Sequence, residues 1–113
     1  MVEIRDGFGL EQLSFGMRPD PAPGPGEVLV NVQAVSLNFR DLLMVECKYN
    51  PSQPLPLIPC SDGAGKVDAV GPGVTRLAPG DRVASVFAQR WLAGEPTLDA
   101  MRSTLGGPLD GML

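Results

Sequence analysis

The sequence predicts a mainly β protein, built as a sandwich or small barrel with one or two short helices. Three observations support this. Residues 27–35 alternate with the two-residue period of a strand and place Val28, Val30, Val32 and Ala34 on one face. Further short apolar runs are separated by turns at regular spacing. The 14 glycines and 12 prolines are scattered between these runs, as in a loop-rich β domain.

Length and composition fit one soluble globular domain. The chain has 113 residues, of which 43% are hydrophobic and 19% are charged. Its net charge is -4 and it has no basic stripe, so nucleic acid is not an expected partner. No apolar run approaches the roughly 18 residues of a membrane span. The N-terminus also lacks a signal-peptide pattern, and we therefore expect a cytoplasmic protein.

Cysteine and histidine usage excludes several kinds of chemistry. Cys47 and Cys60 are the only cysteines, and histidine is absent. A structural zinc site with four Cys or His ligands therefore cannot form. Catalysis by Ser-His-Asp or Cys-His groups within this chain is excluded for the same reason. A disulfide is not expected in a reducing compartment.

The first half of the chain contains two predicted strands, at 11–15 and 27–35, joined by a proline-rich stretch at 18–26. Four prolines in that stretch remove backbone donors and fix φ, which indicates an extended surface connection. A proline-rich interaction motif is the alternative.

At Phe39 the apolar period changes from two residues to that of a helix, which we expect to run to Val45. Asn38 is a suitable N-cap, and Asp41 three residues later gives a variant of the capping box. A second proline-rich loop, 51–59, follows the helix.

The second half is predicted to hold strands at 62–71 and 82–87, separated by glycine-containing turns. Residues 89–92 are a further strand candidate. Thr97 can cap a short helix that ends at the glycines 106–107. The residues expected to line one face of that helix are Leu98, Met101, Arg102 and Leu105.

The densest group of polar residues lies at the corner between the strand at 27–35 and the first helix. Asn38, Arg40 and Asp41 are the candidates for binding or catalysis there, although capping and a solvated arginine explain them equally simply. Tyr49 follows shortly, and its phenol can hydrogen-bond a substrate carbonyl or donate a proton. The alternative for Tyr49 is a half-buried aromatic ring. Trp91 is a candidate for core, interface or binding site.

Two glycine motifs have structural rather than functional explanations. Residues 63–66, Gly-Ala-Gly-Lys, lack the first glycine and the final Ser or Thr of a phosphate loop, and a strand follows instead of a helix. Residues 80–83, Gly-Asp-Arg-Val, fit a turn. No Gly-x-Gly-x-x-Gly dinucleotide fingerprint occurs in the chain.

Four segments in order resemble the N-terminal, GroES-like domain of the medium-chain dehydrogenase/reductase superfamily. They are Leu-Asn-Phe-Arg-Asp at 37–41, Pro-Cys-Ser-Asp-Gly-Ala-Gly-Lys-Val at 59–67, Val-Gly at 70–71 and Gly-Asp-Arg-Val at 80–83. The resemblance covers nearly the whole chain. It implies a GroES-like irregular β-barrel, with residues 1–113 as one domain that lacks its C-terminal end.

The resemblance is to the zinc-free branch of quinone oxidoreductases and enoyl reductases. Zinc-dependent members have a cysteine where this chain has Asn38, and a His-Glu pair where it has Ser61 and Asp62. Asn38 and Asp41 reproduce the Asn-x-x-Asp pattern of quinone oxidoreductases. Leu43 departs from that branch, which often has a tyrosine there.

For a complete enzyme, the resemblance implies hydride transfer between NAD(P)H and a carbonyl, quinone or enone, without zinc. Asn38 and Asp41 would shape the corner beside the nicotinamide, and Tyr49 would hydrogen-bond the substrate oxygen. Phe39, Arg40 and Trp91 would face substrate or cofactor, and Arg40 would favour phosphate.

The resemblance also implies a following Rossmann domain of roughly 130 residues, which would hold the cofactor. We therefore expect residues 1–113 alone to be inactive, and to self-associate or form homo-oligomers through exposed apolar surface. Two alternatives remain open. One is a stand-alone GroES-like binding or assembly module without redox activity, and the other is an enoyl reductase segment of a synthase.

Overall fold

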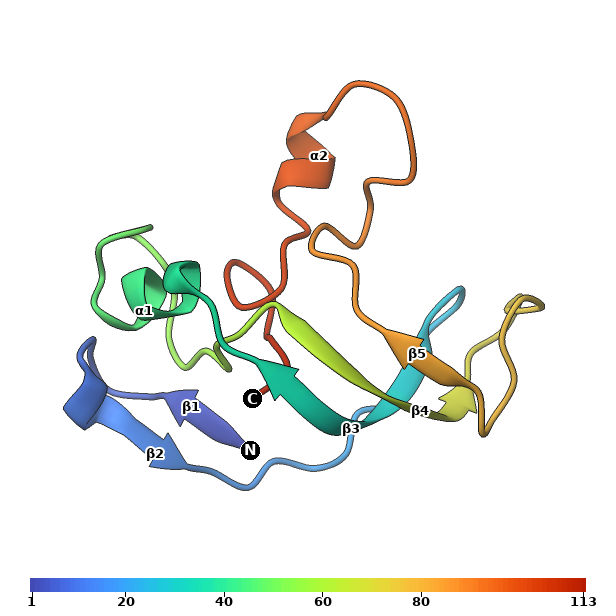
Figure 1. Ribbon diagram of the computed structural model, residues 1–113, viewed down its shortest axis with the longest axis horizontal. Helices are drawn as coiled ribbons and strands as arrows, with labels where there is room; N and C mark the ends of the chain where they lie inside the picture. The colour runs from blue at the N-terminus through green and yellow to red at the C-terminus, as the bar shows by residue number, and fades with distance from the viewer.

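Two antiparallel sheets form the framework of the computed structural model, which describes all 113 residues (Figure 1). The smaller sheet pairs two strands, and the larger has the strand order β3-β4-β5. The prediction of a mainly β chain with short helices is confirmed. The strands are β1 (Val2–Ile4), β2 (Leu13–Phe15), β3 (Val28–Ser36), β4 (Asp62–Val70) and β5 (Arg82–Ala84), and the helices are α1 (Phe39–Val45) and α2 (Leu98–Met101).

The long pair β3–β4 carries the corner. Its register places Ser36, the last residue of β3, opposite Asp62, the first residue of β4. Register shifts between Leu29 and Val30, and again between Val32 and Ala34, interrupt the ladder. Such bulges interrupt the strict alternation of side chains between the two faces of a strand, and no residue of β3 is fully buried. Val32 and Ala34 are exposed.

Helix α1 runs over the predicted residues and packs on the small core. Met44 and Val45 are buried with Ile4 and Leu57 in one apolar cluster. Ile4 and Leu57 exchange two backbone hydrogen bonds, of 2.8 and 2.9 Å, which dock β1 against the loop before β4. The sequence analysis did not predict β1, because three residues are too short to show a period.

The predicted strand at 11–15 begins later than expected. Residues Leu10–Gln12 form a 3-10 turn, and β2 begins only at Leu13. The last predicted strand is shorter than expected and ends at Ala84 rather than at residue 87. The Ser85 N–H still donates to Gly63 O, but the return bond from the Gly63 N–H goes to the Ser85 hydroxyl, which itself donates to Ser61 O. The side chain thus takes the place of one of the two ladder bonds at this pair.

Two further expectations are wrong. Residues 89 and 90 form a turn and residues 91 and 92 have no regular structure, so the strand expected at 89–92 is absent. Helix α2 ends at Met101, so Leu105 lies outside it, and Ala100 is its buried residue. Thr97 does cap α2, accepting a hydrogen bond from the Ala100 N–H.

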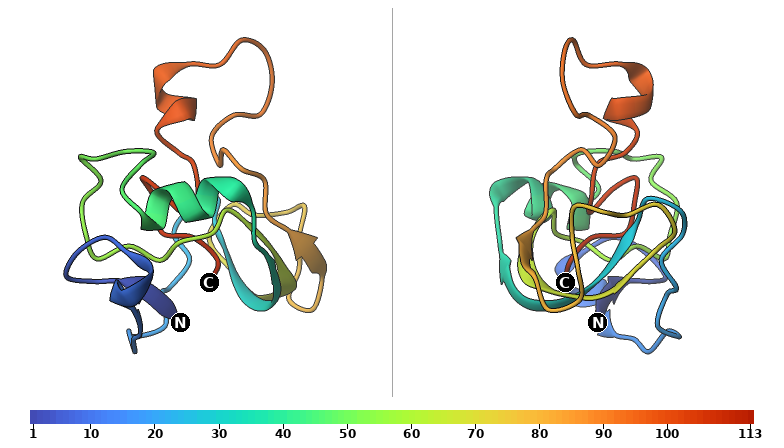
Figure 2. Two further views of the ribbon diagram at one scale, coloured as in Figure 1. Left: turned by 60° about the vertical axis from the view of Figure 1, so that its left-hand side comes forward. Right: turned by 90° about the vertical axis from the view of Figure 1, so that its right-hand side faces the viewer.

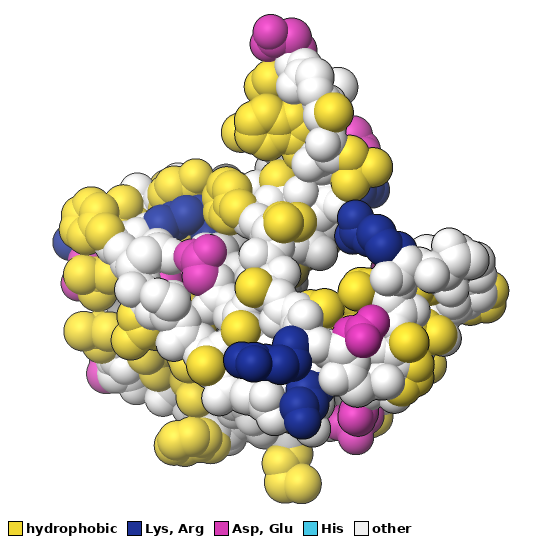
Figure 3. Space-filling view, turned by 45° about the vertical axis from the view of Figure 1, so that its right-hand side comes forward, with side chains coloured by type: hydrophobic (Ala, Val, Ile, Leu, Met, Phe, Trp, Pro, Cys, Tyr) yellow, Lys and Arg dark blue, Asp and Glu magenta, His cyan; other side chains and the backbone are white.

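The segment Val86–Met101, here called the arm, projects away from both sheets (Figures 1 and 2). Its apolar side chains gather on a protrusion of the molecular surface (Figure 3). Leu92 is 92% exposed and Leu98 is 77% exposed. Neither helix of the protein is long and apolar enough to cross a membrane.

Candidate functional site

The predicted corner forms where β3 ends and α1 begins. Asn38 lies between them in an extended conformation and caps the helix. Its Oδ1 accepts a hydrogen bond of 2.9 Å from the Arg40 N–H, and its own N–H donates to Asp41 Oδ2 at 2.8 Å. These reciprocal bonds give partners to two backbone donors at the start of the helix, as the capping pattern predicted.

The Asn38 side chain also faces the start of β4. Its Nδ2 donates to Asp62 Oδ2 at 2.7 Å and to Ser61 Oγ at 3.3 Å. Ser61 Oγ donates to the same Asp62 oxygen at 2.9 Å. Sequence reasoning did not include Ser61 and Asp62 among the site residues. Pairing the two predicted strands antiparallel would have found them, because it brings the end of one beside the start of the other.

A buried carboxyl and a buried thiol lie beneath this polar group. Asp41 is 5% exposed, and its Oδ1 has no hydrogen-bond partner. Burial raises the pKa of the Cys60 thiol to about 12, and repulsion from the Asp41 carboxylate adds to this effect. Cys60 therefore stays protonated at neutral pH, which makes it a poor nucleophile and a poor metal ligand.

The Arg40 side chain contacts parts of the chain that are distant in sequence from the corner. Its guanidinium donates to the carbonyl oxygens of Leu105 and Gly107, and it lies over the rings of Tyr49 and Phe87. Sequence reasoning did not anticipate the contributions of Phe87 and the loop at 105–107, since none of these residues carries a chemical signature of its own.

Two exposed aromatic side chains flank Arg40: Phe39 precedes it in the chain, and the Tyr49 ring lies against its guanidinium. Phe39 is 73% exposed and Tyr49 is 52% exposed. The Tyr49 hydroxyl makes no hydrogen bond within the chain, so it is free to bind another molecule. Trp91 is elsewhere: it lies on the arm, with its Nε1 donating to Gly94 O. Five of the six predicted site residues thus share one region, and Trp91 does not.

The donor set at the corner does not suit zinc. Zinc in proteins takes thiolate, imidazole or carboxylate ligands, and here the central residue is an amide. The Asn38 Nδ2 directs its N–H groups at Asp62 and Ser61, so it presents donors rather than a lone pair. No group of three or more His, Cys, Asp or Glu residues lies close enough together to hold a metal.

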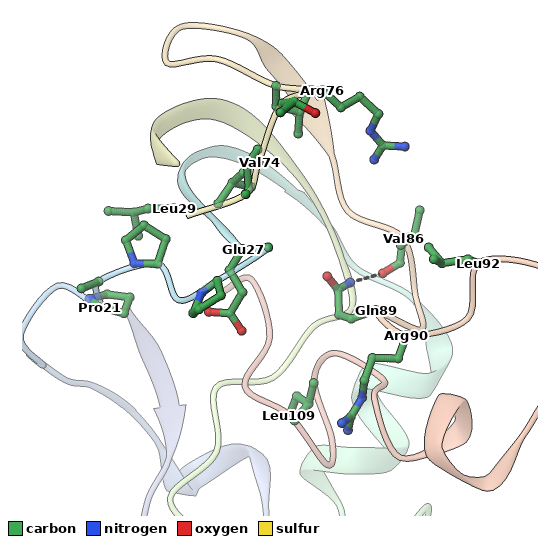
Figure 4. Close-up of a pocket in the computed structure, with 18 residues that line it drawn as sticks. Pro21, Glu27, Leu29, Val74, Arg76, Val86, Gln89, Arg90, Leu92 and Leu109 are labelled. Carbon is green, nitrogen blue, oxygen red and sulfur yellow. Dashed lines mark hydrogen bonds between the residues drawn. The ribbon is translucent and has the colours of Figure 1, made fainter. Parts of the chain in front are cut away.

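A cavity of about 1000 Å³ lies apart from the corner. Figure 4 shows its lining, which comes from the proline-rich loop around Pro21, the turn around Val74 and the base of the arm around Arg90. None of the six predicted site residues lines it. Its size alone therefore does not make it the site of the chemistry.

Comparison with known proteins identifies the fold as a GroES-like N-terminal domain. The family model of the alcohol dehydrogenase GroES-like domain matches residues 24–113. A zinc-type alcohol dehydrogenase-like protein of Schizosaccharomyces pombe is 46% identical over 87 residues, which are 77% of this chain and 25% of that protein. A trans-enoyl reductase of Fusarium mangiferae is 46% identical over 82 residues, or 68% of this chain and 21% of that protein.

Among solved structures, an NAD-dependent alcohol dehydrogenase superposes with a TM-score of 0.81 at 34% identity, covering 97% of this chain and 34% of the other. The chain therefore belongs to the alcohol dehydrogenase GroES-like domain family. Its homologues lie in the medium-chain dehydrogenase/reductase superfamily and include quinone oxidoreductase and enoyl reductase types. The matched segment makes up a quarter or less of the length of these two curated relatives.

Proposed function

We propose that this chain is the substrate-side domain of an NAD(P)-dependent medium-chain oxidoreductase that works without zinc. Membership of the family supports the oxidoreductase class. The observation that carries the zinc-free part is the contact between Asn38 Nδ2 and Asp62 Oδ2, at 2.7 Å, in the position where a metal-binding relative would place ligands. A bound nicotinamide, held by a Rossmann domain, would supply or accept the hydride.

The residues of this chain would bind and orient the substrate. Tyr49 offers an exposed hydroxyl without a partner in this chain, which suits hydrogen bonding to the oxygen of a carbonyl, quinone or enone. Phe39 offers an exposed apolar ring for the carbon skeleton. Asn38 and Asp41 fix the start of α1, and Asn38 also ties it to β4. The similarity to a trans-enoyl reductase supports conjugated double bonds as one substrate class.

NAD(P)H oxidation tests this proposal. The 113-residue chain and a fusion that joins it to the Rossmann domain of a family member are assayed with a quinone and an enone. We expect activity from the fusion only, unchanged by a metal chelator. Tyr49→Phe should lower kcat by about 100-fold, the low end of what a positioned proton donor contributes. Activity of the chain alone, or loss of activity with chelator, would contradict the corresponding part of the proposal.

The proposal also takes a small molecule, rather than nucleic acid or a membrane, as the partner, and it places the protein in the cytoplasm. Cell fractionation and a gel-shift assay test these two parts directly. Recovery in a membrane pellet or retardation of nucleic acid would count against them.

A stand-alone binding or assembly module is the second candidate. The exposed arm favours it, since Leu92 and Leu98 present apolar surface without a partner in this chain. An inactive fusion together with stable self-association of the chain would support the module over the enzyme.

A further inference from the structure

Arg40 makes two long-range hydrogen bonds that tie the first turn of α1 to the C-terminal part of the chain. Its Nη1 donates to Leu105 O at 3.0 Å and its Nη2 to Gly107 O at 2.6 Å. Bonds from a charged donor are stronger than those between neutral groups, and the planar guanidinium holds both in one geometry. They join segments that are more than 60 residues apart in sequence.

The loop that Arg40 holds is shaped for close packing. Gly106 and Gly107 both have positive φ, of 68° and 124°. A Cβ on Gly106 would lie 2.9 Å from the backbone nitrogen of Cys60, so the loop rests directly on the residue beside Asp41. Gly107 O accepts a second hydrogen bond, of 2.6 Å, from Thr104 Oγ1.

The same guanidinium lies over two aromatic rings. Its central carbon is 4.6 Å from the centroid of the Tyr49 ring and 4.8 Å from that of Phe87. Both distances are within the range of cation–π attraction. Arg40 therefore contacts Tyr49, Phe87 and the loop at 105–107 at the same time.

Because of these contacts, the paired Nη groups of the Arg40 guanidinium are not free to bind an anion. Both Nη atoms donate to carbonyl oxygens, and Nε is buried without a partner. A phosphate could bind the two Nη groups only if both carbonyl bonds were broken, which would leave Leu105 O without this donor and Gly107 O with only the bond from Thr104.

We propose that Arg40 is a positioning residue, which orients the Tyr49 ring against Phe87 and the loop at 105–107, and that it does not bind phosphate. The positioning of Tyr49 by Arg40, here called the tether, rests only on the hydrogen bonds and ring contacts of Arg40. Only the catalytic use of the oriented tyrosine rests on the proposed function.

Nuclear magnetic resonance of the 113-residue chain tests the tether without any activity assay. The chain has seven arginines, and the Nε–Hε signal of Arg40 is the one missing from the Arg40→Lys spectrum. In the wild-type chain we expect this Hε to exchange slowly and to be shifted by the two rings. Addition of inorganic phosphate or NADPH should not change the chemical shift of this signal. Movement of this signal on addition of phosphate, or fast exchange in the wild type, would overturn the proposal.

Variants add a second readout. Arg40→Lys keeps the charge but cannot donate to both carbonyls in the same geometry, so the ring signals of Tyr49, the only tyrosine, should shift. Arg82→Lys is the matched control, because Arg82 is exposed and has no ion pair or ring contact. Unchanged Tyr49 signals in Arg40→Lys would overturn the proposal, and the wild-type measurement remains decisive if that variant does not fold.

In an active fusion, Arg40→Lys should lower kcat roughly tenfold through misplacement of Tyr49, with little change in KM for NADPH. A large rise in KM for NADPH with kcat unchanged would instead indicate phosphate binding by Arg40. An inactive wild-type fusion would count against the proposed function, while the spectra would still decide the role of Arg40.

Discussion

The side-chain amide of Asn38 donates to the carboxylate of Asp62 at 2.7 Å, and this bond joins the start of helix α1 to the start of strand β4. The same residue caps the helix through its Oδ1. One side chain thus performs two structural tasks at the centre of the candidate site, and its substitution should reveal both.

Asn38→Ala should lower the free energy of unfolding by roughly 2 kcal/mol, about 1 from the lost cap and about 1 from the lost bond to Asp62. Asn38→Ser keeps a capping oxygen but has no amide to reach Asp62, so it should lose about half as much. Urea unfolding followed by circular dichroism measures both. Asn31→Ala, an exposed change on β3, should stay within about 0.5 kcal/mol. Equal losses in the Ala and Ser variants would show that the cap contributes nothing.

Cys60 should make stability depend on pH in the alkaline range. Because its pKa rises from the ordinary 9.0 to about 12 on folding, the unfolded chain loses this proton first as pH increases. The contribution is therefore complete below pH 9 and is lost as pH rises towards 12. Cys60→Ala should show a flatter decline than the wild type over this range in urea titrations. Parallel curves would contradict the raised pKa.

Thiol labelling gives an independent check of the same feature. Cys47 is partly exposed and Cys60 is buried. At neutral pH an alkylating reagent should modify Cys47 quickly and Cys60 only when the chain unfolds, because the reagent cannot reach a buried thiol. Peptide mass mapping after brief labelling distinguishes the two. Equal labelling rates would mean that Cys60 is accessible and ionised.

The helix at the corner could be predicted from sequence because its signals are local. Asn38 as cap, Asp41 three residues later and the change of period at Phe39 all lie within one turn, and the structure has the helix at the same residues. The long strands β3 and β4 were predictable for the same reason, within one residue at each end.

The rest of the site depends on contacts between distant segments. Arg40 reaches Gly107 across 67 residues, and no local pattern at either end indicates that pairing. The early end of β5 follows from Ser85 bonding to residues 22 and 24 positions away. Trp91 was grouped with the corner because of its residue type, whereas its position is set by the path of the arm.

A buried ion pair near the termini should make the chain sensitive to acid. Glu3 is fully buried and accepts hydrogen bonds from Arg18, which also pairs with Asp110. The hydrogen bond from Arg18, followed by the charge of Arg5, holds the pKa of Glu3 below its ordinary value of 4.5. Since the folded-state pKa is lowered, the stabilisation is present above pH 4.5 and is lost as pH falls through the folded value.

Glu3→Gln tests this prediction. It should lower the melting temperature at neutral pH, because Arg18 loses its charged acceptor, and it should flatten the further loss of stability below pH 4.5. Differential scanning calorimetry across the acid range measures both effects. Glu11→Gln, an exposed carboxyl on the 3-10 turn, is the control and should leave the acid profile unchanged. If Glu3→Gln loses stability with falling pH as steeply as the wild type, Glu3 is not the cause of the acid sensitivity.

The arm should mediate self-association of the isolated chain. Leu92 and Leu98 are exposed on a segment that projects from the sheets, and contiguous apolar surface of this kind is usually covered by a partner. Light scattering coupled to gel filtration should therefore show a mass that rises with protein concentration. The double variant Leu92→Glu, Leu98→Glu should stay monomeric at the same concentrations, because it places charges in the contact.

Met17→Glu is the matched control, since Met17 is 98% exposed but lies just after β2 rather than on the arm. If Met17→Glu also abolishes association, the contact does not run through the arm. A wild-type chain that remains monomeric throughout would show that the apolar surface of the arm alone is not sufficient to hold two copies together.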